Sequence, residues 1–164
     1  MDERIPAQPP RALIAPACAR VHLAGDVEHP AALTVADLRA LPQRTVQARY
    51  VCGRRGEQPH TYTGPELLEV LLAAGPRFHP VIGKDRVRFL VVVTGRDGHL
   101  AVLSWGEIDP RYSGSAVLMA TSVDDRPLDT HGPQLVVPGD TAGGRYVSQI
   151  TSIWTGPATT LTDI

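Results

Sequence analysis

The chain is poor in the features that mark several common classes of protein. It has 2 cysteines in 164 residues, too few for a disulfide framework. Lys84 is its single lysine, and the formal net charge is -1, so no basic surface for nucleic acid is indicated. No apolar run is long enough to cross a membrane, and the N-terminus lacks an apolar signal core. We therefore expect a cytoplasmic protein that binds neither nucleic acid nor membrane.

The familiar signatures of nucleotide binding, zinc binding and serine hydrolysis are also missing. There is no GxGxxG, no Walker loop and no GxSxG, and the 6 histidines are scattered without metal-ligand spacing. If the chain carries chemistry, it must lie in less standard segments.

The organisation of the chain indicates one domain. A proline-rich, extended arm is expected over residues 1–19, a single globular domain over 20–155 and a loose, threonine-rich tail over 156–164. The length agrees with a prior of about 150 residues per domain. Because short strands and hairpin turns outnumber helices, we predict an α+β fold. Its sheet is mixed but mostly antiparallel, with a barrel-like core and a few short helices.

Local patterns place the individual elements. Thr34 with Asp37 predicts one helix start, and Thr63 with Glu66 predicts another through a capping box. The segment from Arg145 to Trp154 is either a strand or a short helix. The remaining strands are expected over residues 20–24, 45–52, 87–93, 99–105, 116–123 and 134–137.

The stretch Val51-Cys52-Gly53-Arg54-Arg55 is the first candidate site. Alternation along residues 45–52 predicts that the thiol of Cys52 points inward, on the same face as Ala48. Positive charge from Arg54 and Arg55 favours the thiolate, which is a nucleophile and a soft metal ligand. The alternative is a buried cysteine that packs as a small apolar group beside two solvated arginines.

The stretch Gly143-Gly144-Arg145 is the second. Two glycines let a ligand approach the backbone closely, and their N–H groups can form an anion nest next to the fixed charge of Arg145. The alternative is a glycine-rich turn that is followed by an exposed arginine.

Taken in order, several short motifs resemble the molybdopterin-binding domain of the sulfite oxidase family, over about residues 21–153. The resemblance implies that family's fold and a molybdenum-cofactor oxidoreductase acting by oxygen-atom transfer. The motifs are Val21 to Val27, Leu33 to Pro42, Val51 to Arg55, Tyr62 to Leu71, Val117 to Leu128, Leu135 to Gly139 and Gly143 to Val147.

The resemblance also implies roles for individual residues. Cys52 would ligate molybdenum, and Arg145 with the Gly143 and Gly144 backbone would hold the pterin. Arg54 or Arg55 would lie near the metal and an anionic substrate. The chain also departs from the family pattern. Two residues are missing between the thiol and the arginine pair, the following loop is short, and Ser148-Gln149 replaces the usual Lys-Trp.

These departures leave two further readings open. In one, the fold works without a cofactor as a cyclase or cycloaddition catalyst on a hydrophobic, polyketide-like secondary metabolite. His60, Tyr62, Tyr146 and Arg145 would then supply polar help in an open cavity. In the other, the chain is a non-catalytic module that binds small molecules. We expect a small-molecule substrate as the partner, and the oligomeric state stays open.

Overall fold

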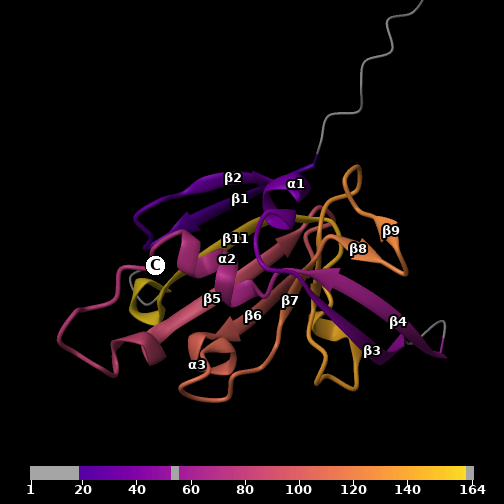
Figure 1. The fold of residues 1–164 in the computed structure, drawn as a ribbon. Coiled ribbons are helices and arrows are strands. Elements are labelled where there is room, and N and C mark those ends of the chain that lie inside the picture. Colours follow the sequence, from indigo (N-terminus) through magenta and orange to yellow (C-terminus); the bar gives the residue numbers. More distant parts are fainter. Residues whose placement is uncertain (1–18, 53–55, 162–164) are drawn as a thin grey trace, which may run out of the picture.

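A five-stranded sheet forms the centre of the protein in the computed structural model, which describes residues 19–52 and 56–161 (Figure 1). The side chains of residues 50–52, 56–58, 160 and 161 lie outside this description. In spatial order the strands are β2 (Ala31–Thr34), β1 (Arg20–Gly25), β11 (Ile150–Pro157), β5 (Phe89–Gly95) and β6 (Leu100–Ser104). The pairing of β1 with β11 is parallel, and the other pairings are antiparallel.

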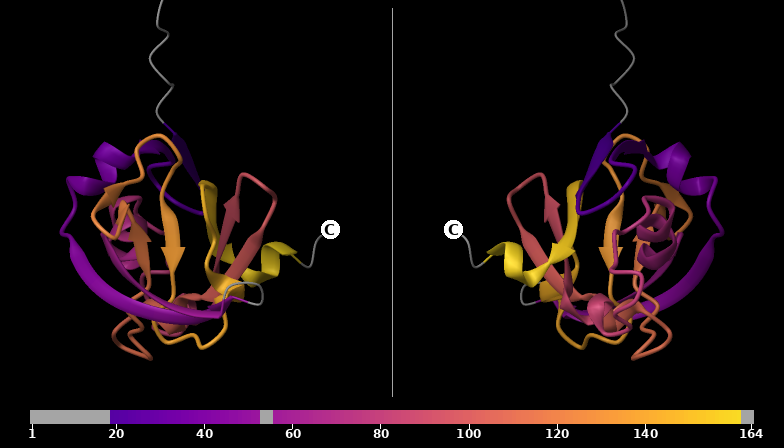
Figure 2. Two further views of the ribbon diagram at one scale, coloured as in Figure 1. Left: turned by 90° about the vertical axis from the view of Figure 1, so that its right-hand side faces the viewer. Right: turned by 90° about the vertical axis from the view of Figure 1, so that its left-hand side faces the viewer.

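A long hairpin stands beside this sheet. β3 (Arg44–Cys52) and β4 (Gly56–Gly64) pair over their whole length, from Arg44 opposite Gly64 to Cys52 opposite Gly56. Figure 2 shows the hairpin curving along one side of the molecule. Two short strands, β8 (Ser122–Val123) and β9 (Arg126–Pro127), extend its sheet, while β7 (Leu118–Ala120) and β10 (Gln134–Val136) form a separate pair.

The helices are short. The α-helices are α1 (Val35–Arg39), α2 (Leu67–Ala73) and α3 (Trp105–Ile108). The described residues also form three 3-10 turns, η1 (Asp85–Arg88), η2 (Gly143–Arg145) and η3 (Ala158–Leu161). None of the helices in residues 19–52 and 56–161 is long and apolar enough to cross a membrane.

One apolar core joins these parts. Val91 and Ile153 from the central sheet, Leu71 from α2 and Met119 from β7 all belong to a single buried cluster. On β5 the buried residues alternate strictly with half-buried ones, which is the pattern of a strand with one face on the core. The hairpin joins the same cluster through Ala48, which is buried, whereas its neighbours Gln47 and Arg49 are exposed.

The fold agrees with the α+β class and with most of the predicted elements. Thr34 caps α1, and its hydroxyl accepts the backbone N–H of Asp37 while the Asp37 carboxylate accepts the backbone N–H of Thr34. The second predicted capping box is wrong. Thr63 lies in β4 and shares a hydrogen bond with Thr45 on β3, so Glu66 itself becomes the N-cap residue of α2.

The C-terminal strand also differs from the expectation. Residues from Arg145 divide into η2 and β11, and the strand starts only at Ile150. β11 then runs to Pro157, although the sequence predicts a loose segment from residue 156. Thr155 is fully buried and donates a hydrogen bond to the Leu90 carbonyl, so pairing with β5 holds the strand beyond the point where its apolar pattern ends.

Candidate functional site

The β3–β4 hairpin determines where Cys52 lies. The cysteine is the last residue of β3, and its backbone is opposite Gly56 at the start of β4. Arg54 and Arg55 lie outside the described residues, as does the side chain of Cys52. The roles predicted for these three residues therefore stay predictions.

The turn η2 lies against β3, so the second candidate segment is next to the strand that carries the first. Chain segments more than 90 residues apart are thus neighbours. An open depression of about 370 Å³ surrounds η2, lined by Gly139, Asp140, Thr141, Ala142, Gly144 and Arg145. Gly144 has open space where a side chain would stand, so a ligand can approach its backbone.

Arg145 is held by two carboxylates. Its Nε and Nη2 donate to Asp140 at 2.8 and 2.7 Å, and its Nη1 donates to Glu107 at 2.6 Å. The hydrogen bond to Asp140, followed by that to Glu107, raises the pKa of Arg145 further above its already high ordinary value. The guanidinium is therefore permanently charged and fixed in orientation, with two of its five N–H groups left over.

The same contacts act on the carboxyl groups. The hydrogen bond from Arg145 lowers the pKa of Asp140. Burial raises the pKa of Glu107, but hydrogen bonds from Arg145 and from the Ser104 backbone together outweigh it, so the net shift is downward. Both groups are ionised near neutral pH. Two carboxylates against one guanidinium leave the cluster with a net charge of -1.

Two tyrosines that were expected to supply polar groups in an open cavity lie together inside the protein. Tyr62 on β4 is 1% exposed and Tyr146 is 5% exposed, with ring centroids 6.2 Å apart. The Tyr146 hydroxyl donates to the Val137 carbonyl at 3.0 Å, as expected for a buried phenol. These contacts make both residues part of the core that supports β4 and η2.

His60 contacts Tyr62 on the side away from the core and is half-buried. Its ring is 6.0 Å from that of Tyr62, edge to face. Its Nδ1 lies 2.7 Å from Asp124, which also accepts the backbone N–H of Thr61 at 2.9 Å. The hydrogen bond from Thr61, and then that from His60, lowers the pKa of Asp124. A carboxylate beside a half-buried imidazole can fix its tautomer for proton transfer.

Sequence reasoning missed the two acidic partners of Arg145. A signal for Glu107 was present, because Ser104-Trp105-Gly106-Glu107 has the capping-box pattern and forms one in the structure. Asp140 has no comparable local signal. Among the residues that the structure describes, no group of three or more His, Cys, Asp or Glu side chains could hold a metal ion.

Comparisons with known proteins bear on the family and the fold of the chain. The model of the oxidoreductase molybdopterin binding domain family matches residues 8–159. Among solved structures, the sulfane dehydrogenase SoxCD from Paracoccus pantotrophus is similar in fold, with a TM-score of 0.65 at 20% identity. The similarity covers 83% of this chain and 37% of the SoxCD chain. A comparison with curated proteins found no match. The chain belongs to the oxidoreductase molybdopterin binding domain family.

Proposed function

We propose that the protein is a molybdenum-cofactor oxidoreductase domain that transfers an oxygen atom to or from a small anionic substrate. The family match over residues 8–159 carries this proposal. The adjacency of β3, which ends at Cys52, and η2, which contains Arg145, supports it. When bound, the cofactor would supply two-electron redox chemistry at a metal that accepts soft sulfur ligands.

The residues present fit such a group in donor type. Cys52 would supply a single thiolate. The backbone of Gly143 and Gly144, open on the Gly144 side, would approach the pterin phosphate, and Arg145 would donate its two remaining N–H groups. Asp140 and Glu107 hold the guanidinium in place, so its orientation does not have to be created when a ligand binds.

His60 and Asp124 would handle protons at the neighbouring strand. Their contact orients the imidazole, and the lowered pKa of Asp124 keeps the carboxylate charged to low pH. A histidine in that pairing can give or take a proton at its other ring nitrogen. Arg54 or Arg55 would attract the anionic substrate by charge.

Metal content tests the proposal. The protein should be produced in cells that make the cofactor and analysed for molybdenum and for the fluorescence of the oxidised pterin. We expect both in the purified protein. Cys52→Ser should abolish the sulfur-to-molybdenum absorption band and the oxygen-transfer activity, while Cys18→Ser, the matched control at the other cysteine, should change neither. Protein without molybdenum from such cells would refute the proposal.

One observation favours a second candidate, a cofactor-free enzyme. The carboxylates around Arg145 leave a net charge of -1 where an anionic phosphate would bind, which disfavours it. A separate apolar cavity of about 190 Å³ lies between β1, β2, α1 and α2. Its lining is mainly apolar, with Leu23, Leu33, Leu38, Leu41 and Val70. It could hold part of a hydrophobic substrate in a reactive conformation, as a cyclase or cycloaddition catalyst does.

Substitutions at Asp140, Cys52 and Val70 distinguish the two candidates. If the carboxylates limit cofactor binding, Asp140→Asn should raise the molybdenum and pterin content of the purified protein. If the cofactor-free reading holds, Cys52→Ser should leave turnover of the organic substrate unchanged. Substituting Val70 by Trp, which fills the apolar cavity, should abolish that turnover. Binding of a hydrophobic compound without turnover would identify the chain as a binding module.

A further inference from the structure

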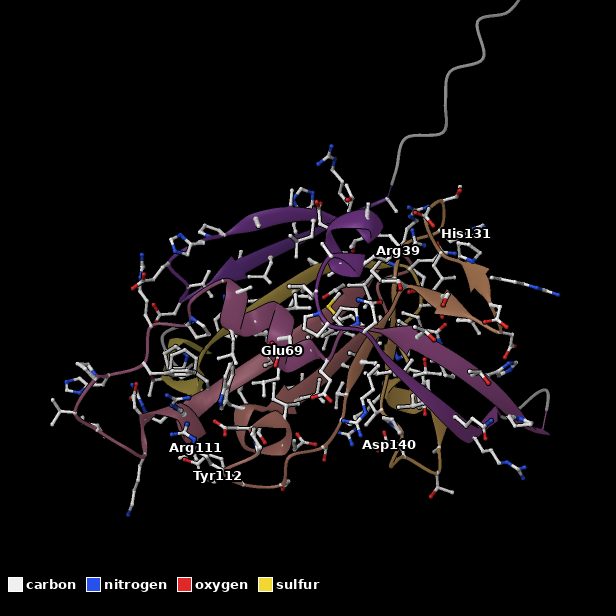
Figure 3. All side chains as sticks on the ribbon, in the orientation of Figure 1. Arg39, Glu69, Arg111, Tyr112, His131 and Asp140 are labelled. Atoms are coloured by element: carbon white, nitrogen blue, oxygen red, sulfur yellow. The ribbon has the colours of Figure 1, made fainter. Side chains whose placement is uncertain are left out.

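We infer that the protein has a second binding site, for a small organic carboxylate with an apolar body, at the end of the molecule that carries η1 and α3. A cavity of about 320 Å³ lies there, a volume typical of small-molecule sites. Figure 3 shows Arg111 and Tyr112 at this end, well apart from Asp140, which lies beside η2. The cavity is therefore separate from the site of the proposed function and does not depend on it. Its lining includes Phe78, His79, Pro80, Ile82, Arg86 and Arg111.

Two arginines share one buried carboxylate at this cavity. Asp109 is 3% exposed, and it accepts hydrogen bonds from the backbone N–H, Nε and Nη2 of Arg111 and from the Trp105 indole. The hydrogen bonds from Arg111 hold the pKa of Asp109 far below its ordinary value, so the group stays ionised. Arg86 lies 3.8 Å from the same carboxylate, too far for a hydrogen bond.

Because two arginines share one carboxylate, the cavity carries a net positive charge. Two guanidiniums against one carboxylate give a net charge of +1. Asp85, at the start of η1, is bonded to Arg88 and to the backbone N–H of His79, and it does not line the cavity. Among the described residues, Arg86 donates no hydrogen bond, so its planar fork of donors is available to a carboxylate.

The remaining walls favour an anion attached to an apolar body. The Arg86 guanidinium lies 4.6 Å above the Phe78 ring, which orients it and leaves its edges open. Nδ1 of His79 accepts the backbone N–H groups of Val81 and Ile82 at 3.3 Å, so the proton of the neutral ring is on Nε2, a further donor. The polar side chains of the lining thus offer donors, while Phe78, Pro80 and Ile82 offer apolar surface.

Titration with benzoate, followed by the indole N–H signals in NMR, tests this site. The chain has two tryptophans, and the Trp105 indole donates to Asp109 at 3.0 Å, directly behind the two arginines. Benzoate should shift the Trp105 signal in a saturable manner and leave that of Trp154, on β11, in place. The variant Trp154→Phe assigns the two signals. Benzyl alcohol, which has the ring without the charge, should produce no saturable shift.

Substitutions locate the binding to the cavity. Arg86→Gln should weaken benzoate binding about tenfold or more, the usual effect of losing a charged hydrogen bond. Arg88→Gln is the matched control, because Arg88 carries the same charge two residues away but is bonded to Asp85. It should bind benzoate within about twofold of the unsubstituted protein, since only a screened surface charge is lost.

Three results would overturn the inference. Benzoate and hexanoate could both leave the Trp105 signal unchanged at about 20 mM. The dissociation constant would then be too high for a specific site. Arg86→Gln with a native spectrum could bind benzoate as tightly as the unsubstituted protein. Arg88→Gln could weaken binding as much as Arg86→Gln, which would show general attraction to a basic surface instead of a site. Molybdenum content plays no part in these measurements, so their outcome is independent of the proposed function.

Discussion

Replacing Arg145 by methionine should destabilise the protein by about 2 kcal/mol at neutral pH. The change removes three hydrogen bonds between charged groups, two to Asp140 and one to Glu107. In a fully buried site each would contribute about 1.5–3 kcal/mol. Here the side chains of Arg145 and Glu107 are each 35% exposed and that of Asp140 is 19% exposed, so water can solvate the abandoned carboxylates in part. Because of that exposure, we expect a total loss of about 2 kcal/mol for the three hydrogen bonds together. Methionine preserves most of the apolar stem.

The effect should depend on pH in a fixed direction. The pKa values of Asp140 and Glu107 are lowered in the folded protein. Groups of this kind stabilise the fold above the pKa they have in the unfolded chain, about 4, and this stabilisation disappears as pH falls through the lower folded value. The difference between the unsubstituted protein and Arg145→Met should therefore be full at pH 7 and should shrink below about pH 4.

Urea unfolding at a series of pH values measures this difference. Arg39→Met is the matched control, because Arg39 pairs bidentately with Asp129 at a more exposed site, where the two side chains are 38% and 42% exposed. We expect it to cost less than about 1 kcal/mol. A loss for Arg145→Met that is the same at pH 3 and pH 7 would refute the electrostatic reasoning and assign the effect to packing.

Further substitutions test other parts of the fold. Gly64→Ala should destabilise by more than about 2 kcal/mol in thermal unfolding, because the added Cβ would lie 2.1 Å from the Met119 carbonyl oxygen, whereas Gly83→Ala, with open space around it, should be neutral. Thr34→Ala should cost about 1 kcal/mol by removing the hydroxyl that caps α1, and an effect below about 0.3 kcal/mol in urea unfolding would contradict that role. Asp109→Asn should cost about 3 kcal/mol at pH 7, since Arg86 and Arg111 would lose their buried counter-ion; a stable Asp109→Asn variant would argue against the charge balance described for that cavity.

The parts of the fold that follow from local sequence were the predictable ones. The Thr34–Asp37 capping box depends on residues three positions apart, and it occurs as expected. Thr63 shows where local reasoning fails. Its pattern suits a helix start, but Thr45 on the partner strand competes for the same side chain and keeps it in β4. Pairing across the sheet outweighs a local preference of about 1 kcal/mol.

In the candidate site, too, the sequence indicates local features but not contacts between distant segments. The sequence indicates that Gly143, Gly144 and Arg145 suit an anion, but not that Glu107, 38 residues away, would reach the guanidinium. That contact depends on how α3 and η2 meet in space. His60, Tyr62 and Tyr146 were predicted as polar groups in an open cavity. Tyr62 and Tyr146 are instead buried. Tyr62 lies on the face of β4 that packs on the core, and Tyr146, which follows η2, is held inside by its hydrogen bond to the Val137 carbonyl.

The central position of β11 has a consequence for how the protein assembles. Strand β11, the last in the described residues, lies between β5 and β1, and β1 begins about 130 residues before it in the sequence. Until β11 inserts, each of these strands presents an open edge to any other extended chain. Because the contacts that close the sheet join distant parts of the chain, folding is expected to be slow for a domain of this size. The interval before closure is then the period in which the protein is most exposed to aggregation, and also the one in which a chaperone would recognise it.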